Sequence, residues 1–231
     1  MLPKVKICGV TQAEVIKHLD NLGVSYAGLW HGIPEGKYNL SLAELTALTS
    51  IPVQNVSFTM VTLNSELDFL SQAIELAHIN AIQFHGFTLP SVIEKIKHQY
   101  GHSIEILKVI HIKDNQCLEG GFIQRYIDAG CDALILDSYQ DNTRIGSTGI
   151  RLEQHVITDF VSTWGNQISI MIAGGLSENT IPELITSTMP FGIDIDSAAR
   201  HNGIINRERV TAIMTSVASA SMPRLETTTV I

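Results

Sequence analysis

The feature that most constrains the fold is a regular alternation of β-rich runs with amphipathic helical stretches along nearly the whole chain. Eight short apolar runs are candidate strands: residues 5–10, 25–30, 53–60, 81–85, 104–112, 133–137, 168–173 and 191–195. Between them, apolar residues recur with a period near 3.6, as at Leu67, Leu70 and Ile74. Strands joined by helices are parallel, and eight such units close a barrel. We therefore predict an α/β fold, a (β/α)8 TIM barrel.

The length of the chain fits one domain of this kind. Barrels of about this size are commonly a single domain, and no linker or low-complexity tract interrupts the alternation in the 231 residues. We expect residues 1–218 to form one (β/α)8 barrel domain. Residues 219–231, which contain Pro223 and a run of threonines, are expected to be a poorly ordered C-terminal tail.

Composition and charge exclude several classes of protein. Hydrophobic residues make up 45% and charged residues 16%, which is typical of a globular chain. No apolar run approaches the roughly 18 residues of a membrane span, and the N-terminus lacks the apolar core of a signal peptide, so we expect a cytoplasmic protein without a membrane partner. A net charge of −8 without a Lys/Arg-dense face argues against nucleic acid.

The cysteines indicate neither disulfides nor a metal site. Cys8, Cys117 and Cys131 are odd in number and lack the spacing of metal ligands. We expect free thiols and no bound metal.

Polar residues stand where the predicted strands end. The carboxyl ends of barrel strands meet on one face, where ligands bind. This face would collect Cys8, His31, Gln83, His85, Asp137 and the segment from Asp194 to Ser197. Each has an ordinary structural interpretation: a buried thiol for Cys8, a hydrogen-bonded histidine for His85, a loop-fixing carboxylate for Asp137. Together, a thiol and a carboxylic acid across the barrel mouth form an acid/base pair suited to a sugar phosphate.

The pair Gly174-Gly175 follows the seventh predicted strand and precedes a helix. Glycines there let the backbone approach a bound group, and barrels commonly bind phosphate at the loops after strands seven and eight. The alternative is a tight turn with no ligand.

Six segments resemble the motifs of one enzyme family, in the same order. They are Lys6-Ile7-Cys8-Gly9-Val10-Thr11, Ile82-Gln83-Phe84-His85-Gly86, Ala133-Leu134-Ile135-Leu136-Asp137, Gly146-Ser147-Thr148-Gly149, Ala173-Gly174-Gly175-Leu176 and Gly192-Ile193-Asp194-Ile195-Asp196-Ser197. With these motifs the chain resembles the phosphoribosylanthranilate isomerases, barrel enzymes of tryptophan biosynthesis.

The resemblance implies an Amadori rearrangement of an N-(5-phosphoribosyl) amine to a 1-amino-1-deoxyribulose 5-phosphate, without a cofactor. It assigns Asp137 as the general acid and Cys8 as the general base. A thiol must be partly ionised to act as a base, so the site is expected to depress the Cys8 pKa or to couple it to the substrate. Gln83 and His85 are implied to bind substrate. The phosphate would rest on Gly174, Gly175, Asp196 and Ser197.

The chain departs from the family pattern in two recognition loops. Where the family usually has Ser-Pro-Arg-Tyr, this chain has Glu35-Gly36-Lys37-Tyr38, so Lys37 replaces the arginine that resembles a clamp for the substrate carboxylate. Near the phosphate, Asp196 replaces Ser and Arg200 replaces Glu. An added carboxylate is unfavourable there unless it points away or Arg200 offsets it.

These departures keep three interpretations open. The first is a family isomerase acting on phosphoribosylanthranilate or an analogue, with a family relative that has a changed sugar-phosphate substrate in specialised metabolism as its variant. The second is a lyase or synthase that forms an imine on Lys108 in the fifth strand. The third is a non-catalytic relative that binds a phosphate ligand. In each case the partner is a small phosphorylated molecule, and we expect a monomer or homodimer.

Overall fold

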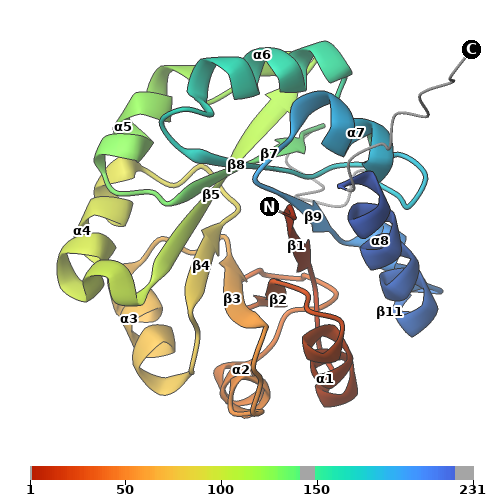
Figure 1. Cartoon of the computed structure of the whole chain (residues 1–231). Coiled ribbons are helices and arrows are strands. Elements are labelled where there is room, and N and C mark those ends of the chain that lie inside the picture. Colours follow the sequence, from red (N-terminus) through yellow and green to blue (C-terminus); the bar gives the residue numbers. More distant parts are fainter. Residues whose placement is uncertain (1, 141–148, 222–231) are drawn as a thin grey trace, which may run out of the picture.

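The fold is a closed barrel of eight parallel strands (Figure 1). The computed structural model describes residues 2–140 and 149–221. The barrel strands are β1 (Lys4–Ile7), β2 (Tyr26–Trp30), β3 (Ser57–Thr62), β4 (Ala81–Phe84), β5 (Glu105–Lys113), β7 (Ala133–Ser138), β8 (Ser169–Ile172) and β9 (Gly192–Ile195). They follow the order β4-β3-β2-β1-β9-β8-β7-β5, and pairing of β4 with β5 closes the ring. The predicted TIM barrel is confirmed.

The helices form an outer ring around the strands in Figure 1. They are α1 (Ala13–Asn21), α2 (Leu42–Thr49), α3 (Leu67–Leu76), α4 (Pro90–Tyr100), α5 (Ile123–Asp128), α6 (Gln154–Trp164), α7 (Ile181–Thr188) and α8 (Arg207–Ala220). Short 3-10 helices cover Gly101–Ser103, Gly120–Phe122 and Ser197–Ala199. Two small antiparallel additions are β6 (Gln116–Cys117), paired with the end of β5, and the hairpin of β10 (Arg200–His201) with β11 (Ile204–Ile205). In the described parts of the chain no helix is both long and apolar enough to span a bilayer.

Several boundaries differ from those expected; the first strand, for example, ends at Ile7 rather than at residue 10. The third strand begins at Ser57 rather than at residue 53, because the backbone N–H groups of Gln54, Asn55 and Val56 all donate to Asp20 Oδ1, at 2.9, 2.6 and 3.1 Å. This carboxylate holds the segment as a turn before the strand begins. The last helix ends at Ala220, so the first two residues of the predicted tail, 219 and 220, are helical. Residues 222–231 lie outside the described part.

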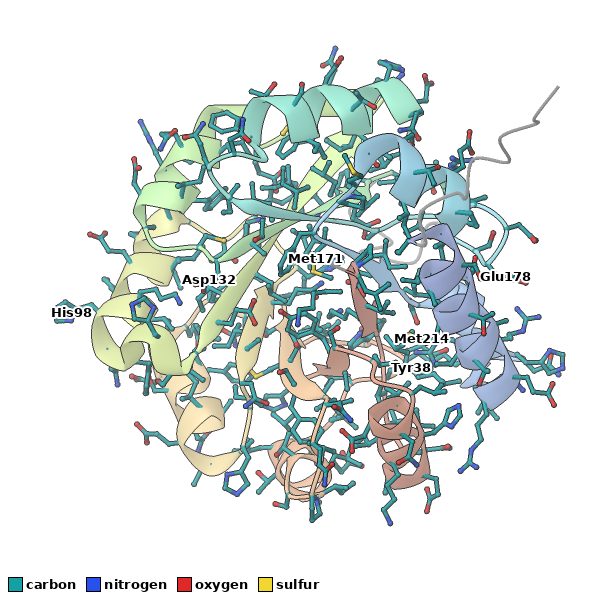
Figure 2. The ribbon with its side chains drawn as sticks, in the orientation of Figure 1. Tyr38, His98, Asp132, Met171, Glu178 and Met214 are labelled. Atoms are coloured by element: carbon teal, nitrogen blue, oxygen red, sulfur yellow. The ribbon has the colours of Figure 1, made fainter. Side chains whose placement is uncertain are left out.

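Apolar side chains pack in two layers. The larger layer lies between the strands and the helices, and the smaller one fills the barrel interior with Tyr26, Leu107, Val109, Ala133, Ile135, Met171 and Ala173. Met171 lies near the centre of the ring of strands in Figure 2. Successive residues of a strand point to opposite faces, which fixes which polar side chains face inward.

Lys108 points away from the barrel interior. Its neighbours Leu107 and Val109 belong to the inner layer, so Lys108 faces the helices, where Nζ lies 3.2 Å from Glu119 Oε1 and 5.3 Å from the ring centroid of Tyr126. The expectation of an interior lysine on β5 is therefore wrong, and imine chemistry on Lys108 has no access to the barrel mouth. The lysine that does face inward is Lys6 on β1.

Gly28 on β2 makes room for the inward side chains of β1. A Cβ atom at position 28 would lie 2.9 Å from Lys6 Nζ and 3.1 Å from Cys8 Sγ. Both distances are shorter than ordinary van der Waals contacts, so only glycine lets Lys6 and Cys8 keep their positions.

We expect Gly28→Ala to lower the free energy of unfolding by about 1–3 kcal/mol, the usual effect of overpacking a core. Urea denaturation followed by circular dichroism measures it. Gly121→Ala is the matched control, because a Cβ there meets nothing within 4 Å. Equal stability of the two variants would contradict this account of Gly28.

Candidate active site

A pocket opens at the carboxyl ends of the barrel strands and encloses about 660 Å³, including its open mouth. Eight of the residues expected at the site line it: Cys8, Gln83, His85, Asp137, Gly174, Gly175, Asp196 and Ser197. His31 does not; its ring is buried, with Nδ1 2.8 Å from Leu40 O. Trp30, Ile33 and Val61 add an apolar part to the lining. The closed barrel thus brings together residues that are up to 189 positions apart in sequence, from Cys8 to Ser197 (197 − 8).

Lys37 lies elsewhere. It is exposed and lines a second cavity with Thr11, Arg200 and Gly203, and its Nζ lies 5.4 Å from the ring centroid of Tyr38. The structure therefore does not bring Lys37 to the pocket that holds Cys8 and Asp137.

Asp137 sits near the end of β7 with a side chain that is almost completely buried. Its Oδ1 accepts a hydrogen bond from the backbone N–H of Ser138 at 2.8 Å. Burial and the nearby charge of Asp194 raise the pKa of Asp137 to about 7, although the Ser138 N–H and Lys6 oppose the shift. Near neutral pH a large share of Asp137 therefore carries a proton that it can donate.

Cys8 follows β1 and is buried. Its backbone N–H donates to Ile195 O at 2.8 Å, and its Sγ accepts a hydrogen bond from Trp30 Nε1 at 3.2 Å. Burial raises the pKa of Cys8 to about 11; the positive charge of Lys6 and the Trp30 N–H act in the opposite direction without overcoming it. Of the two alternatives expected, a depressed pKa is contradicted, because removal of the thiolate from water outweighs the favourable neighbours. Coupling of the thiol to the substrate stays a prediction.

Lys6 is a buried charge beside the site that the sequence analysis did not single out. It is fully buried in the barrel interior, and its Nζ donates to both carboxylate oxygens of Asp194, each at 2.9 Å. Although burial opposes a charged amine, Asp194 and Cys8 raise the Lys6 pKa, so the ammonium form persists. The alternation Lys4-Val5-Lys6-Ile7-Cys8 contains the clue, because a period of two places Lys6 on the same face as Cys8.

Gln83 and His85 present polar atoms that lack protein partners. Gln83 Nε2 lies 3.4 Å from His85 Nδ1, while Gln83 Oε1 and His85 Nε2 are buried without a hydrogen bond. Burial, followed by the charges of His111 and two lysines, lowers the pKa of His85 to about 3, so the ring is neutral. Buried polar atoms in native proteins almost always have partners. These two therefore point to a polar group of a ligand, such as a sugar hydroxyl.

The glycine loop, Gly174-Gly175, follows β8, and its backbone can come close to neighbouring atoms because it lacks side chains. Gly174 and Gly175 have φ values of 79° and 59°, which favour glycine. A Cβ at Gly175 would lie 2.5 Å from Arg151 N, and one at Gly174 would lie 2.9 Å from Ile150 O. The Gly-Ser-Thr-Gly segment at residues 146–149 is another of the motifs that resemble the family. Its Gly149 lines the pocket, whereas residues 146–148 lie outside the described part.

Arg200 offsets the added carboxylate of Asp196. Its Nε donates to Asp196 Oδ1 at 2.6 Å, and its Nη2 donates to the carbonyl oxygens of Cys8 and Gly9 at 2.9 and 3.0 Å. The carboxylate of Asp196 was expected to be tolerated beside a phosphate if Arg200 offset its charge, and the structure contains this ion pair.

The described part of the chain offers no group of three or more His, Cys, Asp or Glu side chains placed to hold a metal ion. The chemistry available in the pocket is proton transfer between a half-ionised carboxylic acid and a protonated thiol, next to a backbone cradle and a neutral amide–imidazole pair.

Comparison with known proteins shows the family of the chain. Residues 5–216 match the family model described as N-(5'phosphoribosyl)anthranilate (PRA) isomerase. The N-(5'-phosphoribosyl)anthranilate isomerase of Acetivibrio thermocellus is 23% identical over 220 residues, 94% of this chain and 96% of that protein.

Two solved structures share the fold. Phosphoribosyl anthranilate isomerase from Thermotoga maritima has a TM-score of 0.77 at 18% identity, covering 94% of this chain and 100% of that one. A phosphoribosyl anthranilate isomerase in complex with reduced 1-(o-carboxyphenylamino)-1-deoxyribulose 5-phosphate has a TM-score of 0.73 at 17% identity over the same shares. Because the family model covers nearly the whole sequence, this chain belongs to the N-(5'-phosphoribosyl)anthranilate isomerase family.

Proposed function

We propose that this protein isomerises N-(5'-phosphoribosyl)anthranilate to 1-(o-carboxyphenylamino)-1-deoxyribulose 5-phosphate, a step of tryptophan biosynthesis, in the cytoplasm. The observation that carries the proposal is that Cys8 and a partly protonated Asp137 share one pocket with the glycine loop Gly174-Gly175. A proton donor, a latent base and a phosphate cradle are what an Amadori rearrangement of a sugar phosphate requires. No cofactor takes part.

The first step opens the ribose ring. Asp137 gives its proton to the ring oxygen while the bond between that oxygen and C1 breaks. The nitrogen lone pair forms a double bond to C1, which leaves a protonated imine and a carboxylate on Asp137. A pKa near 7 suits this role, because the acid is still protonated near neutral pH yet releases its proton readily.

The second step removes the proton on C2. The imine cation forms in the pocket and favours a negative sulfur, so the Cys8 thiol gives its proton to the carboxylate of Asp137, directly or through water. The thiolate then takes the C2 proton, and the C2–H electron pair neutralises the imine. The resulting enol tautomerises to the ketone. Cys8 and Asp137 both return to their starting protonation states.

Other residues of the pocket lining would bind the rest of the substrate. The phosphate would rest on the backbone of Gly174 and Gly175 and on Ser197, with Asp196 held by Arg200. The unpaired atoms of Gln83 and His85 would receive sugar hydroxyls.

A second candidate is an isomerase of the same type that acts on a different amine. It is favoured by the pocket lining, which contains Trp30, Ile33 and Val61 but, among the described residues, neither Lys nor Arg. An aromatic ring fits such a lining, whereas the carboxylate of anthranilate finds no cation in it. Residues 141–148 lie outside the described part.

We expect Cys8→Ala and Asp137→Asn each to lower kcat by about 10²–10⁴-fold, the usual contribution of a general acid or base. The assay follows the loss of fluorescence of phosphoribosylanthranilate. Cys117→Ala and Asp128→Asn are matched controls, since neither residue lines the pocket, and both should keep full activity. Activity that survives both site substitutions would exclude this pair as the catalyst.

The value of kcat/KM should fall as the pH rises through about 7, because the free enzyme must hold a protonated Asp137. Between pH 6 and pH 8 the protonated fraction of such an acid drops about tenfold. The substrate phosphate titrates near pH 6 and affects only the acidic side. A profile that stays flat to pH 9 would contradict the role of Asp137.

The identity of the amine is tested with two substrates, phosphoribosylanthranilate and its aniline analogue without the carboxylate. If anthranilate is the substrate and Lys37 binds its carboxylate, Lys37→Ala should raise KM for the first substrate about tenfold and leave the second unchanged. If the amine differs, kcat/KM should be similar for both substrates and insensitive to Lys37.

A further inference from the structure

Four residues around the end of β1 contact one another in a closed circuit, which we call the Cys8 bracket: Cys8, Trp30, Tyr38 and Arg200. Trp30 Nε1 donates to Cys8 Sγ at 3.2 Å. The Trp30 and Tyr38 rings pack edge to face with centroids 5.3 Å apart, and the Arg200 guanidinium lies 3.7 Å above the Tyr38 ring. Arg200 Nη2 returns to the Cys8 carbonyl at 2.9 Å. Cys8 is thus held at its sulfur and at its main chain.

The bracket is anchored to the hairpin that follows β9. Tyr38 Oη donates to Gly203 O at 2.9 Å, and Arg200 Nη1 donates to the same carbonyl at 3.2 Å. In Figure 2, Tyr38 lies on the side of the barrel where α1 and α8 are found. Three segments that are far apart in sequence therefore meet behind Cys8.

Arg200 directs its donors to protein atoms and not to the pocket. Its side chain is 8% exposed, it bonds Asp196 and the carbonyls of Cys8, Gly9 and Gly203, and it is not among the residues that line the pocket. Gly9 leaves the space that the guanidinium fills, since a Cβ there would overlap Nη2. Arg200 therefore holds the main chain at Cys8, Gly9 and Gly203 in place and offers no donor to a ligand in the pocket.

The proposed proton transfer explains why Cys8 would need to be held in one position. Proton abstraction from carbon requires the sulfur at a defined place, and a small displacement of a catalytic group is costly. A hydrogen bond donated to sulfur also favours the thiolate over the thiol, and the Trp30 N–H indeed lowers the Cys8 pKa against the effect of burial.

We propose that Trp30, Tyr38 and Arg200 are positioning residues for Cys8, with Trp30 orienting and activating the sulfur and Arg200 fixing the main chain that carries it. The inference rests on the proposed function only for its kinetic consequences. The state of the thiol itself can be tested without any turnover.

The first experiment measures the rate of Cys8 alkylation between pH 8 and 9.5 by peptide mass spectrometry. Trp30→Phe keeps a ring but removes the donor, so the rate should fall about tenfold, as expected for loss of a hydrogen bond to a charged group. Iodoacetamide and hydrogen peroxide should show the same factor, because both react with the thiolate. Cys117 in the same samples and Trp164→Phe serve as controls. An unchanged or faster rate, or different factors for the two reagents, would overturn the role of Trp30.

The second experiment isolates the contacts of Arg200 with the main chain. Comparing Asp196→Ser with Asp196→Ser/Arg200→Gln avoids leaving an unpaired carboxylate near the phosphate. Relative to Asp196→Ser alone, the added Arg200→Gln substitution should lower kcat about tenfold. It should leave KM within twofold, since Arg200 does not line the pocket. Arg200→Lys in the same background should fall between them, and Arg207→Gln, an exposed residue of α8, should have no effect.

An unchanged kcat, or a rise in KM alone, would overturn the role of Arg200. If the wild-type protein turned over neither phosphoribosylanthranilate nor its aniline analogue, the proposed function would be contradicted. The alkylation rates would still decide whether Trp30 acts on Cys8.

Discussion

The buried ion pair of Lys6 and Asp194 is the interaction on which the site depends. It lies inside the barrel, where Asp194 lines the pocket and both of its carboxylate oxygens are 2.9 Å from the Lys6 ammonium. Burying two charges is costly, and breaking such a pair costs more because one charge is left alone. The pair also acts on the pKa values of its neighbours: besides burial, which is the main cause of both shifts, Asp194 raises the pKa of Asp137, while Lys6 opposes the rise for Cys8. One interaction thus links the stability of the barrel interior to the two groups of the proposed proton transfer.

The fold and most of the site could be predicted from the sequence because both depend on local pattern. Alternating strands and helices determine a closed barrel, and the barrel brings the strand ends together, so Cys8, Gln83 and Asp137 line one pocket. The face of a strand residue follows from its parity. Applied to β1, where Cys8 marks the inward face, this rule would have found Lys6. On β5 the rule needs the structure, because only the packing of Leu107 and Val109 shows which face points inward.

The remainder depends on contacts that no local pattern contains. The start of β3 is set by Asp20, more than thirty residues earlier. Arg200 reaches the Cys8 carbonyl across 192 positions. The pKa of Cys8 reflects how completely the fold removes the thiol from water, and a motif cannot show that. Lys37 illustrates the same limit, because its loop carries it toward Gly203 and not toward the pocket.

The raised pKa of Cys8 has a consequence for the chemical durability of the empty enzyme. Oxidants and electrophiles attack the thiolate and not the thiol. With a pKa of about 11, only about one Cys8 in 10⁴ is ionised at pH 7. In the proposed mechanism Cys8 ionises only while a substrate cation occupies the pocket, so the thiol would be shielded from irreversible oxidation between turnovers.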